Sequence, residues 1–114
     1  MTRPMALLGG GFDFSAANEA EFNAWYDTEH IPRLSALSGV LMARRFKAAG
    51  EATAGSADRK YVATYRLTSP DVCESADWKD AALTPWTRRM LPHLKDSLRL
   101  RLKRYVTPPA RPLP

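Results

Sequence analysis

Four short segments of the chain have the hydrophobic pattern of β-strands. The segment 98–103 is the clearest, because leucine alternates there with arginine or lysine at a period of two. The segments 40–48 and 60–67 divide into two faces by the same period, and the largely apolar segment 5–14 has Gly9–Gly11 at its centre. Glycines inside a strand favour a bulge or a close backbone approach, so an irregular strand is expected there.

A helix is predicted between the first two strands. The aromatic residues of this region recur at helical spacing: Phe22, Trp25 and Tyr26. Asn18 followed by Glu21 resembles a capping box at the start of a helix. Pro32 interrupts the pattern, because a proline inside a helix removes a backbone hydrogen bond. The helix is therefore expected over 19–30, with Pro32 marking its end.

A second helix is predicted after the third strand. Ser69-Pro70 favours a helix start, since proline is well tolerated near the first helical position. The helix is expected over 71–83, and Thr84-Pro85 ends it. The residues available for its inner face are Val72, Cys73, Ala76 and Leu83. A short further helical turn is expected within 86–94.

The predicted elements follow the order β-α-β-β-α-β. This is the order of the ferredoxin-like α+β fold, with a four-stranded antiparallel sheet. A chain of 114 residues has the length of one domain. We expect that domain to span 1–106, with a flexible hairpin loop of small and polar residues at 49–59. Residues 107–114 contain four of the nine prolines, which predicts an extended tail.

The first three predicted strands carry large apolar side chains on both faces of the sheet. These side chains are Leu7, Leu8, Leu41, Met42, Phe46, Tyr61, Val62 and Tyr65. Two short helices cover only one face of a four-stranded sheet. A monomer would then expose an apolar patch of roughly several hundred square ångströms, which soluble monomers seldom do. We therefore expect a homodimer formed through the sheet faces.

The composition is that of a globular protein, with 45% hydrophobic, 25% charged and 10% aromatic residues. It excludes a disordered chain, a collagen-like repeat and a coiled coil. No apolar run approaches the ~20 residues that a membrane span needs. The start of the chain lacks the hydrophobic region of a signal peptide. A cytoplasmic protein with no membrane partner is therefore expected.

The formal net charge of +5 lies in the second half of the chain. Residues 51–114 hold twelve Lys/Arg against seven Asp/Glu, whereas residues 1–50 hold five of each. The basic segment 88–104 could follow a phosphate backbone. However, no helix-turn-helix, zinc-finger or RNA-recognition motif is present, so no nucleic-acid partner is expected. Attraction of a small anionic substrate explains the same charge.

The segment 22–33 is the most distinctive source of chemistry in the sequence. Tyr26 and Asp27 lie four and three residues before His30, so each is expected to share a helix face with the imidazole. A phenol or carboxylate at that distance can orient an imidazole and tune its pKa for general acid or base catalysis. In the alternative interpretation, His30 only caps the C-terminus of the helix, where a cation is mildly favourable.

Several sequence runs carry a family resemblance, and together they cover most of residues 18–90. The most specific is Trp-Tyr-Asp-Thr-Glu-His-Ile-Pro at 25–32, and the others are Gly39–Phe46, Lys60–Tyr65 and Thr84–Met90. These runs resemble the dimeric α/β-barrel superfamily, and within it the EthD-like group and its uncharacterised relatives. The resemblance implies a ferredoxin-like protomer, a dimer formed through the sheets, and a pocket between sheet and helices. The superfamily includes cofactor-free monooxygenases, polyketide cyclases, lactone isomerases and haem proteins, so the fold alone does not choose the activity.

The residues that could hold a metal or a cofactor are few. Cys73 is the only cysteine, which excludes an internal disulfide and a cysteine-rich metal site. The two histidines, His30 and His93, are far apart in sequence and form no metal-binding motif. Haem needs only one axial ligand, which either histidine could supply. We nevertheless expect no metal and no cofactor.

With metal and cofactor sites set aside, we expect general acid or base catalysis in an aromatic pocket. The candidate catalytic residues are His30 as acid or base and Tyr26 or Asp27 as its orienting group. The candidate substrate-binding residues are Trp25, Arg44, Tyr65, Arg66 and Trp86, with an arginine stabilising a developing oxyanion and the aromatic rings packing a flat substrate. One hypothesis is a small cofactor-independent enzyme of cyclase, isomerase or monooxygenase type, acting on an aromatic, polyketide-like or lactone compound. The other is a non-catalytic dimeric protein that binds a small apolar or aromatic molecule in the same pocket.

Overall fold

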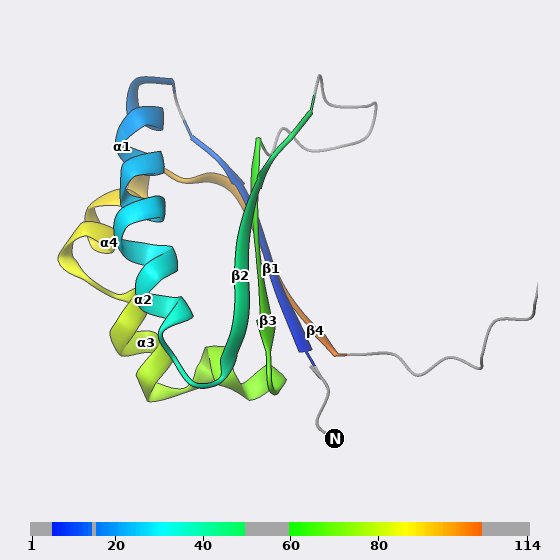
Figure 1. Ribbon diagram of the computed structural model, residues 1–114. Coiled ribbons are helices and arrows are strands. Elements are labelled where there is room, and N and C mark those ends of the chain that lie inside the picture. The colour runs from blue at the N-terminus through cyan, green and yellow to red at the C-terminus, as the bar shows by residue number, and fades with distance from the viewer. Residues whose placement is uncertain (1–5, 15, 50–59, 104–114) are drawn as a thin grey trace, which may run out of the picture.

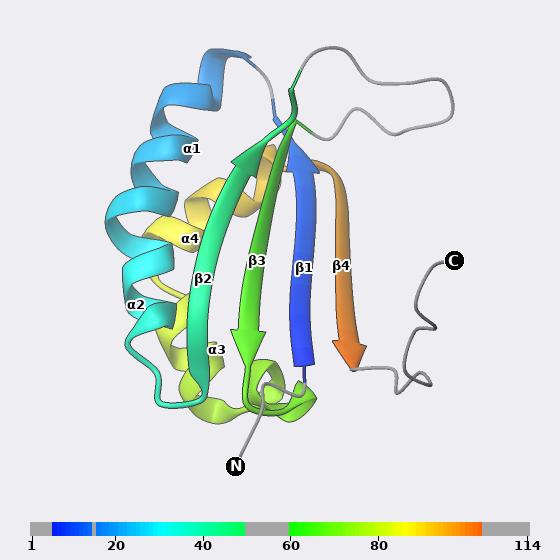
Figure 2. The same cartoon turned by 45° about the vertical axis from the view of Figure 1, so that its right-hand side comes forward.

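A four-stranded antiparallel sheet forms one layer of the molecule. The computed structural model describes residues 6–14, 16–49 and 60–103. Its strands are β1 (Ala6–Asp13), β2 (Val40–Lys47), β3 (Tyr61–Leu67) and β4 (Lys95–Lys103), arranged in the order β2-β3-β1-β4 (Figure 2). Every neighbouring pair is antiparallel. The four predicted strands and the ferredoxin-like α+β arrangement are confirmed.

Two of the predicted regions fall outside the described residues. They are the hairpin loop, apart from Ala49, and the proline-rich tail at 107–114. The domain boundary at residue 106 therefore stays a prediction.

The first helical region is one continuous path built from four short helical segments. They are η1 (Ala16–Asn18), α1 (Glu19–Trp25), the π-helical η2 (Tyr26–His30) and α2 (Ile31–Ser35). The prediction that Pro32 ends the helix is wrong. Pro32 lies in the first turn of α2, where its missing N–H and fixed backbone angle are tolerated, so the chain stays helical to Ser35. The expected capping box is also absent, because the Asn18 side chain makes no capping hydrogen bond to α1.

The second helical region consists of η3 (Pro70–Glu74), α3 (Ala76–Ala82), α4 (Pro85–Met90) and η4 (Leu91–His93). The helix expected over 71–83 is divided at Ser75 into η3 and α3, whereas α4 and η4 occupy the place of the further helical turn expected within 86–94. The backbone is extended at Ser75, whose hydroxyl accepts a hydrogen bond from the Trp78 N–H at 3.1 Å and so begins a new helix. Thr84 caps α4 in the same way, by accepting from the Thr87 N–H at 3.1 Å.

This division changes which side chains of the region face the sheet. Cys73 is buried as expected and Val72 is partly buried, but Ala76 and Leu83 are exposed. Trp78 and Ala82 take their place in the core. The difference arises because the helical phase is reset at Ser75, so positions counted from residue 71 no longer predict the inner face.

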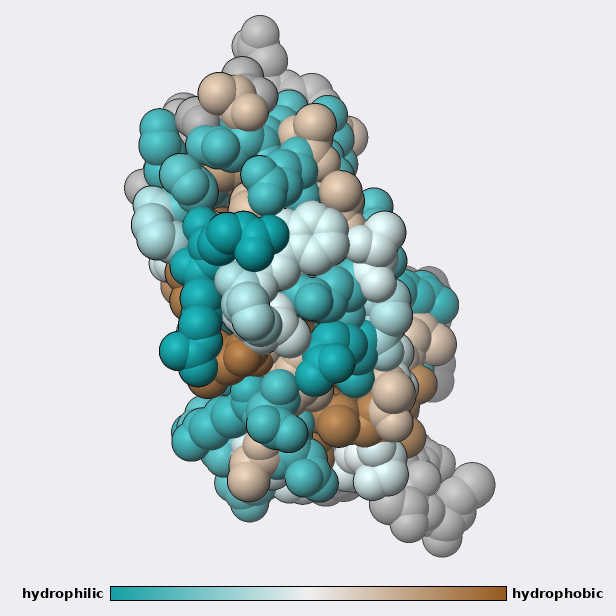
Figure 3. All heavy atoms as spheres, turned by 90° about the vertical axis from the view of Figure 1, so that its left-hand side faces the viewer, coloured by the Kyte–Doolittle hydropathy of each residue, from teal (hydrophilic) through white to brown (hydrophobic). Residues whose placement is uncertain are grey.

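All the helices lie on one face of the sheet, as Figure 1 shows. Hydrophilic side chains cover most of the outer surface of this helical layer, with small apolar patches between them (Figure 3). The core between the layers is rich in aromatic rings. Phe22 has no exposed surface and stacks on Phe14 with ring centroids 3.8 Å apart, and Phe14 in turn stacks on Tyr61 at 5.2 Å. No helix of the described residues is long and apolar enough to cross a membrane.

The other face of the sheet, which we call the open face, carries no helix among the described residues (Figure 1). On β4, Leu98, Leu100 and Leu102 point to this face and are 42, 46 and 44% exposed. They pair with the β1 residues Gly11, Gly9 and Leu7. Phe46 and Val62 extend the apolar surface across β2 and β3 with exposed fractions of 51% and 38%. The two-faced pattern expected from the sequence is therefore present.

Candidate functional site

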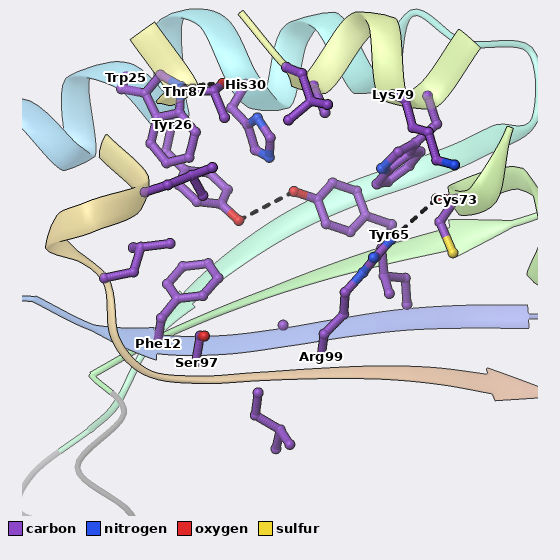
Figure 4. Close-up of a pocket in the computed structure, with 18 of the residues that line it drawn as sticks. Phe12, Trp25, Tyr26, His30, Tyr65, Cys73, Lys79, Thr87, Ser97 and Arg99 are labelled. Carbon is purple, nitrogen blue, oxygen red and sulfur yellow. Dashed lines mark hydrogen bonds between the residues drawn. The ribbon is translucent and has the colours of Figure 1, made fainter. Parts of the chain in front are cut away.

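A cavity of about 370 Å³ lies between the sheet and the helical layer. The strands β1, β3 and β4 form one wall, and η2, α3 and α4 form the other (Figure 4). Aromatic side chains dominate the lining: Phe12, Trp25, Tyr26, Tyr65 and Trp78. Gly10 on β1 also lines the cavity, and a Cβ atom there would make ordinary contact with the Phe12 ring at 3.5 Å. A mostly apolar cavity with a few polar groups is the usual form of a small-molecule site.

His30 lines this cavity from η2. Its ring packs against Trp25 and Tyr26, with centroid distances of 4.6 and 4.9 Å. The Nδ1 atom is buried and has no hydrogen-bond partner among the described residues. Burial lowers the pKa of His30 to about 4, so the imidazole is neutral at neutral pH. A neutral imidazole carries one hydrogen-bond donor and one acceptor.

Two buried tyrosines face each other across the cavity. The Tyr65 hydroxyl donates to the Tyr26 hydroxyl at 3.4 Å, and Figure 4 shows the His30 ring directed from the helical layer toward this pair. Burial raises the pKa of Tyr26 to about 12, against smaller opposing effects of the Tyr65 hydrogen bond and the Arg45 charge. Burial and the neighbouring Tyr26 raise the pKa of Tyr65 well above its usual value. Both phenols are therefore protonated and can act as hydrogen-bond donors.

His30 lies about one π-helical turn beyond Trp25, whose ring it contacts. The Ile31 N–H donates to the Tyr26 carbonyl, an i→i+5 bond that widens the helix for one turn. Such single π turns are frequent at functional sites. The wider turn also changes the angular spacing of the residues that follow Tyr26.

Asp27 does not line the cavity, although it was expected to orient His30. Its carboxylate accepts from Arg45 Nη1 at 2.7 Å and its side chain is 62% exposed. The expectation assumed α-helical spacing, in which positions i and i+3 share a face. In the π turn Asp27 is directed to the outside edge of the helix near β2, so the structure does not bring it to His30.

A chain of hydrogen bonds fixes the Trp25 side of the cavity wall. The Trp25 indole N–H donates to the Thr87 hydroxyl at 3.1 Å. The Thr87 and Thr84 hydroxyls lie 3.1 Å apart, and the Thr84 hydroxyl donates to the Glu29 carboxylate at 2.6 Å. The indole N–H and both threonine hydroxyls have hydrogen-bond partners, so the chain holds the indole in one orientation beside His30.

The expected substrate-binding residues divide into two groups. Trp25 and Tyr65 line the cavity, whereas Arg44, Arg66 and Trp86 do not. Arg44 pairs with Thr64 and Arg66 pairs with Met42, both on the open face of the sheet. Trp86 lies on α4, where its indole N–H donates to Glu21 at 3.2 Å. The structure therefore brings His30, Tyr26, Trp25 and Tyr65 together and places the other candidates elsewhere.

Charged residues that sequence reasoning did not select also line the cavity: Glu74, Lys79 and Arg99. Arg99 alternates with the leucines of β4, so once those leucines are known to face the open side, Arg99 must face the helices. The sequence shows the alternation of leucine with arginine along β4. It does not show which face of the sheet the helices cover, so Arg99 could not be assigned to the cavity from the sequence alone. Lys79 and Glu74 depend on the divided second helical region, which the hydrophobic pattern did not predict.

Within the described ranges, no group of three or more His, Cys, Asp or Glu side chains could hold a metal ion. Cys73 lines the cavity but its thiol donates to the Pro70 carbonyl at 3.3 Å.

No protein-family model matches the sequence, and no curated protein matches it either. Solved structures do match the fold. An EthD family protein from Bacillus halodurans is 10% identical with a TM-score of 0.64, over 89% of this chain and 99% of its own. A dimeric ferredoxin-like protein of unknown function from Thermobifida fusca is 14% identical with a TM-score of 0.60, over 90% of this chain and 94% of its own.

A third similar structure comes from Deinococcus radiodurans and is described as a candidate antibiotic biosynthesis monooxygenase. It is 9% identical with a TM-score of 0.64, over 95% of this chain and 100% of its own. The chain has the ferredoxin-like fold. At these identities the likeness shows the fold and carries no residue-level assignment.

Proposed function

We propose that the protein is a small cofactor-independent enzyme that transfers a proton on an aromatic, polyketide-like or lactone compound held in this cavity. The observation that carries the proposal is the His30 imidazole, buried on the wall of an aromatic cavity with Nδ1 unpartnered among the described residues. A general base needs a neutral nitrogen beside the proton it removes. A protein described as a candidate monooxygenase has the same fold, which supports an enzyme on this architecture.

The phenol pair supplies the complementary group. Tyr65 donates to the Tyr26 oxygen, which leaves the Tyr26 hydroxyl proton available for an oxygen atom of the substrate. As His30 removes a proton, negative charge develops on that oxygen, and a donor in a water-poor cavity stabilises it strongly. The same negative charge raises the pKa of the nearby imidazole, which offsets the weak basicity that burial imposes on His30 in the empty cavity.

The second candidate function is non-catalytic binding of a similar molecule. The low pKa of His30 favours it, because a group with a pKa of about 4 is a weak base at neutral pH. In that case the imidazole and the phenols serve only as hydrogen-bonding partners of a bound ring compound.

Proton exchange of an enolisable ketone separates the two functions. We expect the protein to accelerate exchange of the α-protons of 2-tetralone in D₂O, followed by proton NMR. His30→Ala should lower this rate by about 10²–10⁴-fold, the usual contribution of a positioned proton-transfer group. His93→Ala is the matched control, because His93 is exposed and lies outside the cavity. Binding of 2-tetralone without accelerated exchange would favour the non-catalytic function.

We also infer that the protein works as a homodimer joined through the open faces of two sheets. The exposed leucines of β4 with Phe46 and Val62 give each copy a continuous apolar surface. The similar protein from Thermobifida fusca is described as dimeric. A cytoplasmic location fits this function and stays a prediction.

A further inference from the structure

Charge is distributed unevenly around the cavity. The interior groups, His30 and the two tyrosines, are uncharged at neutral pH because of burial. The charged lining residues, by contrast, are exposed to solvent. They are Arg99 on β4, Lys79 on α3 and Glu74 at the end of η3. The cavity therefore has a neutral aromatic interior, and these charged side chains lie at its solvent-exposed mouth beside the exposed Leu83 and Leu91.

Arg99 is held across this mouth. Its Nη2 donates to the Cys73 carbonyl at 3.2 Å, and Figure 4 shows its side chain rising from β4 toward the helical layer. Its positive charge is close enough to favour the ionised form of Tyr65. No carboxylate among the described residues pairs with Arg99. Most of its five N–H donors therefore have no protein partner in the described residues.

The charges around Arg99 leave a positive balance. Lys79 has no ion pair among the described residues. Among the described residues, the lining of the cavity contains one carboxylate, that of Glu74. Its Oε1 atom lies 3.7 Å from Nη1 of Arg101. The described charges at the mouth are therefore two positive, Arg99 and Lys79, and one negative, Glu74. The Glu74 carboxylate is paired with Arg101, which does not line the cavity.

We propose that the cavity binds a flat ring compound with an ionised acidic group, such as a carboxylate, and that Arg99 binds this group at the mouth with help from Lys79. The proposal rests on the function proposed above and names the class of its ligand. A planar guanidinium matches a carboxylate through two parallel hydrogen bonds, and such charged bonds are the strong ones. The ring then lies among the aromatic side chains, with its far end toward His30 and Tyr26.

A pair of probes that differ only in charge tests the proposal. 2-Naphthoate and its neutral amide, 2-naphthamide, have the same ring and nearly the same shape. Dissociation constants would be measured by isothermal titration calorimetry for the wild type and for Arg99→Gln. Arg89→Gln is the matched control, because Arg89 is an exposed arginine of α4 outside the cavity lining.

We expect the wild type to bind 2-naphthoate more tightly than 2-naphthamide. Arg99→Gln should weaken 2-naphthoate by roughly 10- to 100-fold, the range for a hydrogen bond to a charged group. It should leave 2-naphthamide unchanged, and Arg89→Gln should leave both unchanged. Lys79→Gln should weaken 2-naphthoate by a smaller factor, since an ammonium group lacks the paired donors with which a guanidinium binds a carboxylate.

Other outcomes overturn the proposal in distinguishable ways. Equal affinity for the two probes, or equal loss of both in Arg99→Gln, removes the acidic-group site but leaves proton transfer on a neutral ring compound standing. If Arg89→Gln weakens 2-naphthoate as much as Arg99→Gln does, the preference for 2-naphthoate over 2-naphthamide comes from the overall positive charge of the protein and not from a site at Arg99. Failure of both probes to bind at millimolar concentration removes the ligand class and counts against the cavity as a binding site altogether.

Discussion

The two faces of the sheet use the same strands for different purposes. On the helix-covered face, buried tyrosines and the Arg99 side chain line a cavity with His30. On the open face, the leucines of β4 are between 42 and 46% exposed and form an apolar surface. Because side chains alternate along a strand, Arg99 and Leu100 are neighbours in the chain yet belong to these two different regions.

The same contrast separates Arg44 from Arg45. Arg44 points to the open face, opposite Thr64. Arg45 points to the helices, where its guanidinium lies 4.6 Å from the centroid of the Tyr26 ring and pairs with Asp27 at 2.7 Å. Two arginines that are adjacent on β2 therefore lie on opposite faces of the sheet. Arg45 packs against Tyr26, a residue of the cavity lining, whereas Arg44 lies in the surface that we assign to the dimer.

The largest effect is expected from a charge in the middle of the open face. Leu100→Asp should convert a dimer of about twice 12.7 kDa into a monomer at micromolar concentration, as measured by light scattering after size exclusion. Each dimer loses two apolar contacts and would bury two carboxylates, which together cost about 4 kcal/mol or more, or roughly a thousandfold in the dissociation constant.

Leu100→Met is the matched control, since it keeps an apolar side chain of similar volume and should stay dimeric. Circular dichroism would establish that Leu100→Asp is folded. A wild-type protein that is monomeric at micromolar concentration would contradict the sheet-to-sheet dimer directly.

The fold was predictable because strands depend on a short, local pattern. The alternation at 98–103 placed β4, and the order of the elements gave the ferredoxin-like arrangement. Helix phase was less predictable. The π turn after Trp25 and the capping hydroxyl of Ser75 each reset the spacing, and neither changes the hydrophobic pattern that a sequence displays. The prediction that Pro32 ends the helix failed because the effect of a proline depends on its position within a helix. Pro32 lies in the first turn of α2, where a proline is tolerated.

The site was predictable only where residues lie close together in the sequence. Trp25, Tyr26 and His30 belong to one turn and line the cavity together. Arg99 could not be assigned, because the sequence shows which residues of β4 share a face but not which face the helices cover. Arg44 was placed among the binding candidates without that knowledge, and the register of β2 against β3 puts it on the open face, opposite Thr64.

The second prediction concerns the pH dependence of stability on the helix-covered face. The folded-state pKa of His30, about 4, lies below its unfolded value of 6.5. Between these values the unfolded chain binds more protons, so the contribution of His30 is fully present above pH 6.5 and is lost as the pH falls to about 4. The free energy of unfolding should fall by up to about 3 kcal/mol over this window because of His30.

Urea unfolding at several pH values would measure this difference. His30→Gln should make the dependence shallower between pH 6.5 and 4, whereas His93→Gln, which changes an exposed histidine, should retain the wild-type slope. Parallel wild-type and His30→Gln curves would mean that His30 is not buried as a neutral group.

The third prediction compares the neighbouring arginines of β2. Arg45→Gln should lower the free energy of unfolding by about 1–3 kcal/mol, because its guanidinium is only 16% exposed and bonds both Asp27 and Asn23 at 2.7 Å. Arg44→Gln, made in the monomeric Leu100→Asp background because Arg44 lies in the surface assigned to the dimer, should change it by no more than about 0.5 kcal/mol. Both would be measured by urea unfolding at one fixed protein concentration, and a larger loss in Arg44→Gln would reverse the assignment of the two faces.

The smallest effect is expected from Asp27→Asn, which tests the distinction between a residue of the cavity and a residue beside it. The Asp27 carboxylate is 62% exposed, so its ion pair with Arg45 should contribute only about 0–1 kcal/mol to stability. The rate of 2-tetralone exchange and its pH dependence should stay at the wild-type values, because Asp27 does not contact His30. A fall in that rate comparable to the effect of His30→Ala would restore Asp27 as the orienting group of the imidazole. It would also mean that the π turn rearranges when a ligand binds, since in the present structure the carboxylate is directed toward Arg45 and away from the cavity.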